Sequence, residues 1–338
     1  MENQRVVITE YGQPSTLKLI SEPIPLPQAG EVRIRVEAAG VSFGDVLQRV
    51  GLFFAGAPKM PYSPGYDVVG TVDAVGEQVK RVRIGDRVAS LPLFGGYARY
   101  LCVPENYIVT GVPPELDAAG VVALVLNYTT AFQMMHRVAG LLKGQSMLAF
   151  GASGGVGSAL LDLGNHMGLK IAAAVSKKWH KSFSGQAHFL FEEKTENSQQ
   201  SLLSFQPGGF DAVFDPIGGT HVWNSRKLVA KGGKLVACGI SSAVKPNGGR
   251  DRSQVLRLGL LLAFSKVCRS PNVELYALDQ RIKTKRQEIN QDIRTLIDLY
   301  SQGLINPRIG ATFTLADAHK AHELIESRNN IGKIVLIP

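Results

Sequence analysis

The chain has 338 residues, a length typical of two domains, and its formal net charge at pH 7 is +9. With 45% hydrophobic and 19% charged residues, the composition is that of a globular protein and excludes a disordered or fibrous chain. The densest basic run, residues 281–286, belongs to no nucleic-acid-binding module, so nucleic acid is not an expected partner. The basic excess then reflects either a solvated surface or attraction of anionic small molecules such as dinucleotides.

Cysteine usage and the apolar runs bear on where the protein resides. Cys102, Cys238 and Cys268 lie at neither metal-ligand nor redox-pair spacing, and such a scattered set fits a reducing compartment. The N-terminus leads into a strand-like segment and shows no signal peptide. The apolar runs 121–126 and 258–264 are far shorter than the ~20 residues needed to span a bilayer. We therefore expect a cytoplasmic protein without a membrane span.

The first part of the chain, residues 1–122, is predicted to be rich in β-strands. Val32, Ile34 and Val36 alternate with charged residues, which is the pattern of a half-buried strand. Further strand-like runs follow at residues 68–75, 87–91 and 97–103, with glycine-containing turns between them. Many short strands between glycine turns predict a compact, barrel-like domain.

The pattern changes at residue 123. A helix is predicted over residues 130–139, and short apolar strands then alternate with helical stretches. The predicted strands cover residues 146–150, 170–175, 188–191, 211–214 and 234–238. Short apolar strands spaced by helices predict a parallel, doubly wound sheet whose two faces are both covered.

The C-terminal stretch does not extend this alternation. Apolar residues at helical spacing predict an amphipathic helix over 289–300, a capping box at 314–317 opens another helix, and residues 333–337 form a closing strand. We expect these elements to return to the first domain and complete it.

A glycine-rich loop carries the strongest local signal. The apolar strand 146–150 runs into the sequence GASGGVG at residues 151–157 and then into a helix. Gly154 and Gly157 permit close approach of the backbone to a pyrophosphate, and the helix N-terminus offers free N–H groups to its oxygens. Ala152 stands at the first position of the usual G-x-G-x-x-G motif. The alternative interpretation is a tight structural turn.

The end of the next strand indicates which dinucleotide binds. An NAD site usually has Asp or Glu there, on the ribose 2′-hydroxyl. Here the strand 170–175 is followed by Ser176, Lys177 and Lys178. A hydroxyl and two cations suit a 2′-phosphate, so we expect NADPH; the alternative is a loop carrying two solvated lysines.

In their order along the chain, several segments together resemble the medium-chain dehydrogenase/reductase superfamily, and within it the zinc-independent quinone oxidoreductase (zeta-crystallin-like) branch. The latter half is most similar to the vesicle-amine-transport-like subgroup. The matching segments are residues 40–45, 64–70, 85–88, 95–98, 130–131, 151–157, 214–219, 299–303 and 329–336.

The resemblance implies an α/β architecture of two domains: a GroES-like β-rich catalytic domain built from residues 1–122 and 267–338, and a Rossmann NADPH-binding domain over 123–266. It implies NADPH bound between the domains and a homodimer whose contact involves the region 256–264; the alternative is that these residues cover the cleft. The implied cofactor contacts are Ala152, Ser153, Gly154, Gly155, Val156 and Gly157 for the pyrophosphate, Ser176, Lys177 and Lys178 for the adenosine phosphate, and Thr130, Gly239, Asn330 and Lys333 for the central and nicotinamide portions.

Zinc is not expected. Relatives with a catalytic metal place Cys and a His-Glu pair in the first domain, whereas this chain has Ser42 or Phe43 and then Tyr66 and Asp67 at those positions. It also lacks the four-cysteine structural lobe of those relatives. Two further departures from the branch concern substrate and cofactor binding. Ser42 replaces a frequent Asn in the substrate cleft, and no tyrosine stands near Glu192, where the branch often uses one to contact the 2′-phosphate.

Without a metal, the cofactor supplies the hydride and the protein supplies position and electrostatics. We expect transfer to a quinone or a conjugated carbonyl, whose oxyanion or α-carbon is then protonated by a hydroxyl or an ordered water. Ser42, Tyr62 and Tyr128 are the candidate hydroxyl donors, each with a structural or substrate-lining role as the alternative, and none stands out as a necessary acid. Ser42, Phe43 and Phe53 are candidates for lining the substrate slot, unless the two aromatic residues are ordinary core side chains.

Asp45 and Arg49, four residues apart, are predicted to form a structural ion pair on a short helix. Three functions remain open. The first is an NADPH:quinone reductase, the second a 2-alkenal or enoyl reductase on the same scaffold, and the third a non-enzymatic NADPH-binding adaptor. Fold alone does not decide among them.

Overall fold

The computed structural model describes residues 2–53, 56–193, 198–245, 248–268 and 272–338, and its side chains are described except at 264–268 and 272. The side chain of Cys268 and part of the predicted dimer contact therefore lie outside the described residues. The chain divides into two compact units, and in each of them the predicted fold class is confirmed. Unit 1 is Met1–Thr129, Pro246–Gly249 and Asp279–Pro338, and unit 2 is Thr130–Lys245 and Arg250–Leu278. The two main boundaries lie further along the chain than predicted, and a short segment inside the predicted Rossmann domain, Pro246–Gly249, groups with unit 1.

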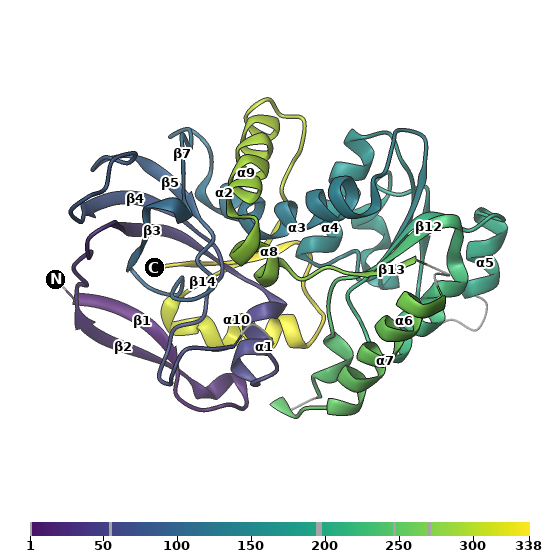
Figure 1. Cartoon of the computed structure of the whole chain (residues 1–338), viewed down its shortest axis with the longest axis horizontal. Coiled ribbons are helices and arrows are strands. Elements are labelled where there is room, and N and C mark those ends of the chain that lie inside the picture. Colours follow the sequence, from purple (N-terminus) through teal and green to yellow (C-terminus); the bar gives the residue numbers. More distant parts are fainter. Residues whose placement is uncertain (1, 54–55, 194–197, 246–247, 269–271) are drawn as a thin grey trace. The chain divides into compact units, whose positions relative to one another are not determined.

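Unit 1 is the β-rich unit (Figure 1, purple to blue with yellow). Its strands are β1 (Glu2–Ile8), β2 (Leu17–Pro23), β3 (Glu31–Val41), β4 (Val68–Val75), β5 (Arg87–Ser90), β6 (Tyr100–Pro104), β7 (Ile108–Thr110), β14 (Ile309–Thr314) and β15 (Lys333–Ile337). Its helices are α1 (Phe43–Arg49), α2 (Ala118–Ala123), α8 (Leu278–Thr284), α9 (Arg286–Ser301) and α10 (Ala318–Glu326).

A seven-stranded sheet in the order β14-β15-β3-β4-β5-β7, with β6 also paired to β3, organises unit 1. The C-terminal strand β15 pairs antiparallel with β3, so the C-terminal segment completes this sheet, whereas the N-terminal strand β1 pairs with β2 in a separate two-stranded sheet. Alternation along β3 buries Val32 and Ile34 completely, as the period-2 pattern predicts.

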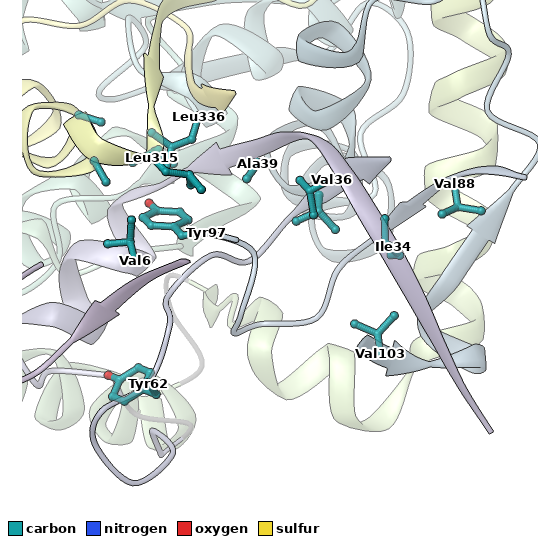
Figure 2. Packing of buried hydrophobic residues seen from close by; sticks show 14 of the residues in the cluster. Val6, Ile34, Val36, Ala39, Tyr62, Val88, Tyr97, Val103, Leu315 and Leu336 are labelled. Carbon is teal, nitrogen blue, oxygen red and sulfur yellow. The ribbon is translucent and has the colours of Figure 1, made fainter. Parts of the chain in front are cut away.

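The inward-facing residues of unit 1 pack into one apolar cluster. Figure 2 shows Val6, Tyr97, Leu315 and Leu336, from distant parts of the chain, close together in it. Burying each such side chain stabilises the fold by about 1.5–3 kcal/mol before the entropic cost. Packing in this core holds the end of β3 in place, and α1 begins just after that end.

Unit 2 contains a six-stranded, all-parallel sheet in the order β10-β9-β8-β11-β12-β13. Its strands are β8 (Ser146–Ala149), β9 (Lys170–Ala174), β10 (Phe189–Phe191), β11 (Phe210–Asp215), β12 (Val229–Ala237) and β13 (Asn272–Leu275). Its helices are α3 (Thr129–Phe132), α4 (Gly155–His166), α5 (Ser198–Phe205), α6 (Thr220–Ser225) and α7 (Arg252–Cys268). The strand order reverses between β8 and β11, which is the point where ligands bind in such sheets.

The predicted helix over 130–139 begins earlier than expected. α2, a π-helical turn (Leu124–Tyr128), α3 and a second π-helical stretch (Gln133–Ala139) form one continuous helix over Ala118–Ala139. Among the described residues this is the one helix long and apolar enough to cross a membrane, with a mean hydropathy of 1.3, but 89% of its most apolar window is buried within the structure. Such burial is typical of a core helix.

Candidate functional site

The glycine loop joins β8 to α4 in unit 2. Gly151 has a φ of +61°, and Gly154 precedes the first turn of α4 in an extended conformation with no side chain capping the helix. A Cβ on Gly157 would lie 2.3 Å from the Gly151 oxygen, so only glycine permits this close packing. Because the N-cap residue is a glycine, no N-cap side chain accepts from the first N–H groups of α4, which a pyrophosphate site uses as donors.

All six predicted pyrophosphate contacts lie in this loop and the first turn of α4. They are Ala152, Ser153, Gly154, Gly155, Val156 and Gly157. The Ala152 N–H donates to the Ala174 carbonyl over 3.1 Å, which holds the loop against the end of β9. Ala152 is buried, so a methyl group is accommodated where the motif usually has glycine.

Ser176, Lys177 and Lys178 follow β9 as exposed residues and open a 3-10 helix, Lys177–Phe183. They lie at the same edge of the sheet as the glycine loop, because β8 and β9 are adjacent and parallel. The Lys177 backbone N–H donates to Glu192 Oε1 over 2.8 Å. The resemblance placed residue 192 near the 2′-phosphate, but the hydrogen bond between the Glu192 carboxylate, at the end of β10, and the Lys177 backbone was not predicted.

The end of β11 carries a second cluster that sequence reasoning missed. Asp215 is buried and accepts from the backbone N–H groups of Ile217 and Gly218, over 2.8 and 3.1 Å, as a turn-fixing residue does. His221 Nδ1 lies 2.6 Å from Asp215 Oδ2, and His221 Nε2 lies 3.2 Å from Glu193 Oε1. Burial alone lowers the pKa of His221, but the two carboxylates outweigh it and raise that pKa to about 9.

Gly239 and Thr130, two further predicted cofactor contacts, also belong to unit 2. Gly239 follows β12 and packs against the turn after Asp215, since a Cβ on it would lie 2.5 Å from the Pro216 oxygen. Thr130 lies within α3. Gly239 is thus at the same sheet edge as the glycine loop, where the carboxyl ends of the parallel strands meet.

In unit 1, Ser42 caps α1 and Phe43 is the first residue of that helix. The Ser42 N–H and hydroxyl each donate to Asp45 Oδ2 over 2.8 Å, and the Gly65 N–H donates to Asp45 Oδ1 over 2.9 Å. Asp45 is completely buried, and burial raises its pKa to about 7 although the hydrogen bonds from Ser42 oppose the shift.

The predicted ion pair between Asp45 and Arg49 is wrong. Asp45 turns back to cap its own helix, whereas the buried Arg49 Nη2 lies 2.6 Å from Glu326 Oε2 on α10. Arg49 Nε also donates to His322 Nδ1 over 3.3 Å. Burial, assisted by Arg49, lowers the pKa of His322 to about 3, so this ring is neutral and structural. The prediction fails because Ser42, at the N-terminus of α1, binds the Asp45 carboxylate through its N–H and hydroxyl, in place of Arg49 one turn further along the helix.

Asp45→Asn is expected to become progressively more stable relative to the wild type as pH rises. A carboxyl whose folded pKa of about 7 exceeds its unfolded value stabilises the fold below about pH 4, and this contribution is lost as pH rises through 7. Because asparagine does not titrate, the difference in free energy of unfolding is expected to shift by about 3 kcal/mol between pH 4 and pH 8. Urea denaturation of both proteins across this range measures it, and parallel pH profiles would contradict the assignment.

The remaining aromatic candidates lie near one another in unit 1. Phe53 makes edge-to-face contacts with Tyr66 and with Phe94, each at 5.7 Å between ring centroids. Tyr62 packs in the same way on Phe94, and its hydroxyl donates to the Gln48 carbonyl over 3.3 Å. Burial raises the pKa of Tyr62. Phe53 is half-buried and so retains an accessible face, as a slot-lining residue needs.

Lys333 takes part in a buried polar cluster. Its Nζ lies 2.6 Å from Asp67 Oδ2 and 3.2 Å from Asn127 Oδ1. Asp67 and Lys333 are 0% and 1% exposed, and burial raises the pKa of Asp67 while the Lys333 ammonium opposes the shift. A Cβ on Gly40 would lie 2.2 Å from Asp67 Oδ2, which explains a glycine there. Lys333 thus has a structural partner, and its role toward a cofactor stays a prediction.

Asn330 and Tyr128 complete the predicted set. Asn330 Nδ2 donates to the Gly332 carbonyl over 3.4 Å in the loop before β15. Tyr128 is buried in the π-helical turn that follows α2. No group of three or more His, Cys, Asp or Glu side chains suited to a metal ion occurs in the described part of the chain. The expectation of a zinc-independent protein stays a prediction.

Comparisons with known proteins cover both units. A family model described as alcohol dehydrogenase GroES-like domain matches residues 28–114, and one described as zinc-binding dehydrogenase matches residues 184–336. The synaptic vesicle membrane protein VAT-1 homolog of Danio rerio is 30% identical, over 98% of this chain and 69% of that protein. The quinone oxidoreductase of Lama guanicoe is 30% identical, over 98% of this chain and 96% of that protein.

Solved structures are also similar to both units of this chain. The quinone oxidoreductase of Pseudomonas syringae pv. Tomato superposes with a TM-score of 0.88 at 25% identity, over 100% of each chain. A mycobacterial protein complexed with NADPH superposes with a TM-score of 0.84 at 26% identity, over 99% of this chain and 100% of that one. Both matches therefore extend over unit 1 and unit 2.

Proposed function

Because the chain belongs to the medium-chain dehydrogenase/reductase superfamily, we propose that it is a zinc-independent oxidoreductase that uses NADPH to reduce a quinone or a related conjugated carbonyl. The superfamily assignment confirms the predicted resemblance, and the similarity to a VAT-1 homolog and to a quinone oxidoreductase agrees with the predicted branch.

The observation that carries the proposal is the glycine loop. The packing of Gly157 against Gly151 and the absence of a side-chain cap at Gly154 form a cradle that fits a diphosphate. A Cβ on Gly154 would meet only the Gly151 oxygen, at an ordinary 3.5 Å, so the loop itself does not require a glycine there. The absence of a side chain at Gly154 is explained if a ligand approaches the backbone closely.

Within unit 2, Ser153 to Gly157 would hold the pyrophosphate, and Ser176 and Lys177 would hold the adenosine phosphate. Bound NADPH would supply the hydride. Within unit 1, the Ser42 hydroxyl and the Asp45 carboxyl form a hydrogen-bonded pair that holds a proton near neutral pH, because the Asp45 pKa is about 7. Such a pair suits protonation of a reduced acceptor, since a general acid works best when its pKa lies near the working pH.

A homodimer and a cytoplasmic location belong to the same proposal. Leu256 and Leu260, one turn apart on α7, are 64% and 62% exposed, and such an exposed apolar pair suits a contact with a second copy of the chain. These residues lie in the predicted contact region, 256–264.

Coenzyme titration followed by a substrate panel tests the function. We expect saturable binding of NADPH by calorimetry, and oxidation of NADPH with simple quinones followed by its absorbance. Turnover confined to enals or enoyl thioesters would favour the alkenal or enoyl reductase. Saturable binding without turnover on any acceptor would favour the adaptor, and no binding of either nicotinamide coenzyme to folded protein would overturn the proposal.

A further inference from the structure

The loop after β9 is hydrogen-bonded to an acidic side chain that comes from the end of β10. Glu192 Oε1 accepts a hydrogen bond from the Lys177 backbone N–H over 2.8 Å. This N–H belongs to the segment in which the proposed function places the 2′-phosphate of NADPH. A carboxylate therefore already occupies an anion-accepting position between the Ser176 and Lys177 backbone and the end of β10.

The position of Glu192 is held from both sides. On one side, the Val175 N–H donates to the Phe191 carbonyl over 2.9 Å and continues the pairing of β9 with β10. On the other side, Glu193 pairs with His221, which is itself held by the buried Asp215. Because these contacts hold the backbone on both sides of Glu192, its side chain stays near Lys177.

We propose that Glu192 determines the coenzyme preference of this protein by competing with the 2′-phosphate of NADPH at the Lys177 backbone. The proposal rests on the proposed function, because it concerns the same binding site. Two anionic groups at one donor repel each other, whereas a neutral ribose 2′-hydroxyl donates a hydrogen bond to a carboxylate. Glu192 therefore weakens the binding of NADPH but not that of NADH. Its charge opposes the attraction between the 2′-phosphate and the two lysines, Lys177 and Lys178.

Glu192→Gln is expected to change the preference in a defined direction. The amide keeps an oxygen acceptor for the Lys177 N–H but removes the negative charge. The ratio of the NADH to the NADPH dissociation constant is expected to rise about tenfold, mainly through tighter NADPH binding, which is the size expected for one charge contact at a partly exposed site. Calorimetry with adenosine 2′,5′-bisphosphate and adenosine 5′-phosphate measures the same effect on probes that differ only in the 2′-phosphate.

Glu193→Gln provides the matched control. It removes the same charge one residue away, from a side chain that faces His221 instead of Lys177. We expect its coenzyme ratio to stay within about twofold of the wild-type ratio. An equal change in both variants would show a general field effect and would overturn the assignment to Glu192.

Glu192→Ala serves as a second variant, and thermal unfolding establishes that each protein is folded. If the wild type binds a coenzyme but neither Glu192 variant raises the ratio, the inference about Glu192 is wrong while the proposed function stands. If the folded wild type binds neither NADPH nor NADH, the proposed function itself fails.

Discussion

Gly157→Ala is expected to weaken NADPH binding at least about 100-fold, which corresponds to about 2.8 kcal/mol. The added Cβ would lie 2.3 Å from the Gly151 oxygen and 2.5 Å from the Ala152 Cα. Both atoms belong to the backbone and cannot rotate away, so the loop and α4 must separate. The separation moves the N–H groups of the first helical turn, whose positions a diphosphate site requires.

The same substitution is expected to lower the free energy of unfolding by about 1–3 kcal/mol, because overpacking a tight contact is costly. Isothermal calorimetry measures the binding, and urea denaturation measures the stability. Gly208→Ala is the matched control, since no atom lies within 4 Å of the added Cβ and the residue is exposed. Binding by Gly157→Ala within a few-fold of the wild type would contradict the pyrophosphate assignment.

Lys333→Met is expected to lower the free energy of unfolding by about 3–5 kcal/mol, because it leaves Asp67 buried without its counter-charge. The two side chains are almost fully buried, and their charged atoms lie 2.6 Å apart. Asp67 Oδ1 has no hydrogen-bond partner among the described residues, so Asp67 depends strongly on the ammonium at its other oxygen. Burial already raises the Asp67 pKa, and removal of Lys333 is expected to favour protonation further.

A double-mutant cycle isolates the pair. Asp67→Asn alone leaves the ammonium buried and is also expected to destabilise the protein. The double variant with Lys333→Met removes both charges and is expected to recover most of the loss, with a coupling energy of about 2–3 kcal/mol. Additive effects of the two single substitutions in urea denaturation would show that the pair is not energetically coupled.

Local patterns were sufficient for the fold class and for the glycine loop. The alternation of Val32 and Ile34 reports which residues face one side of a strand, and it needs no knowledge of the partner strand. The glycines at 154 and 157 report a backbone that must come close to another group, which is again a local property. The structure places all of these features where the patterns predicted them.

Long-range partners were beyond local patterns. Arg49 pairs with Glu326, which lies on a different helix of unit 1, and the spacing rule pointed to Asp45 instead. Spacing along a helix identifies neighbours on that helix only, and a capping site or a packed helix offers stronger partners. The contact of Glu192 with Lys177 was not predicted for a related reason, since the end of β9 and the end of β10 meet only when the sheet is formed.

By itself the sequence determined the two-part α/β architecture, the glycine loop between β8 and α4, and the hydroxyl and lysines that follow β9. These features depend on the spacing of hydrophobic residues and glycines, which acts over a few neighbouring residues. Only the tertiary structure decided that Glu192 reaches Lys177 and that Asp67 holds Lys333, 266 residues away along the chain. The energy of a charge depends on burial and on what lies within a few ångströms, and only the folded chain brings those groups together.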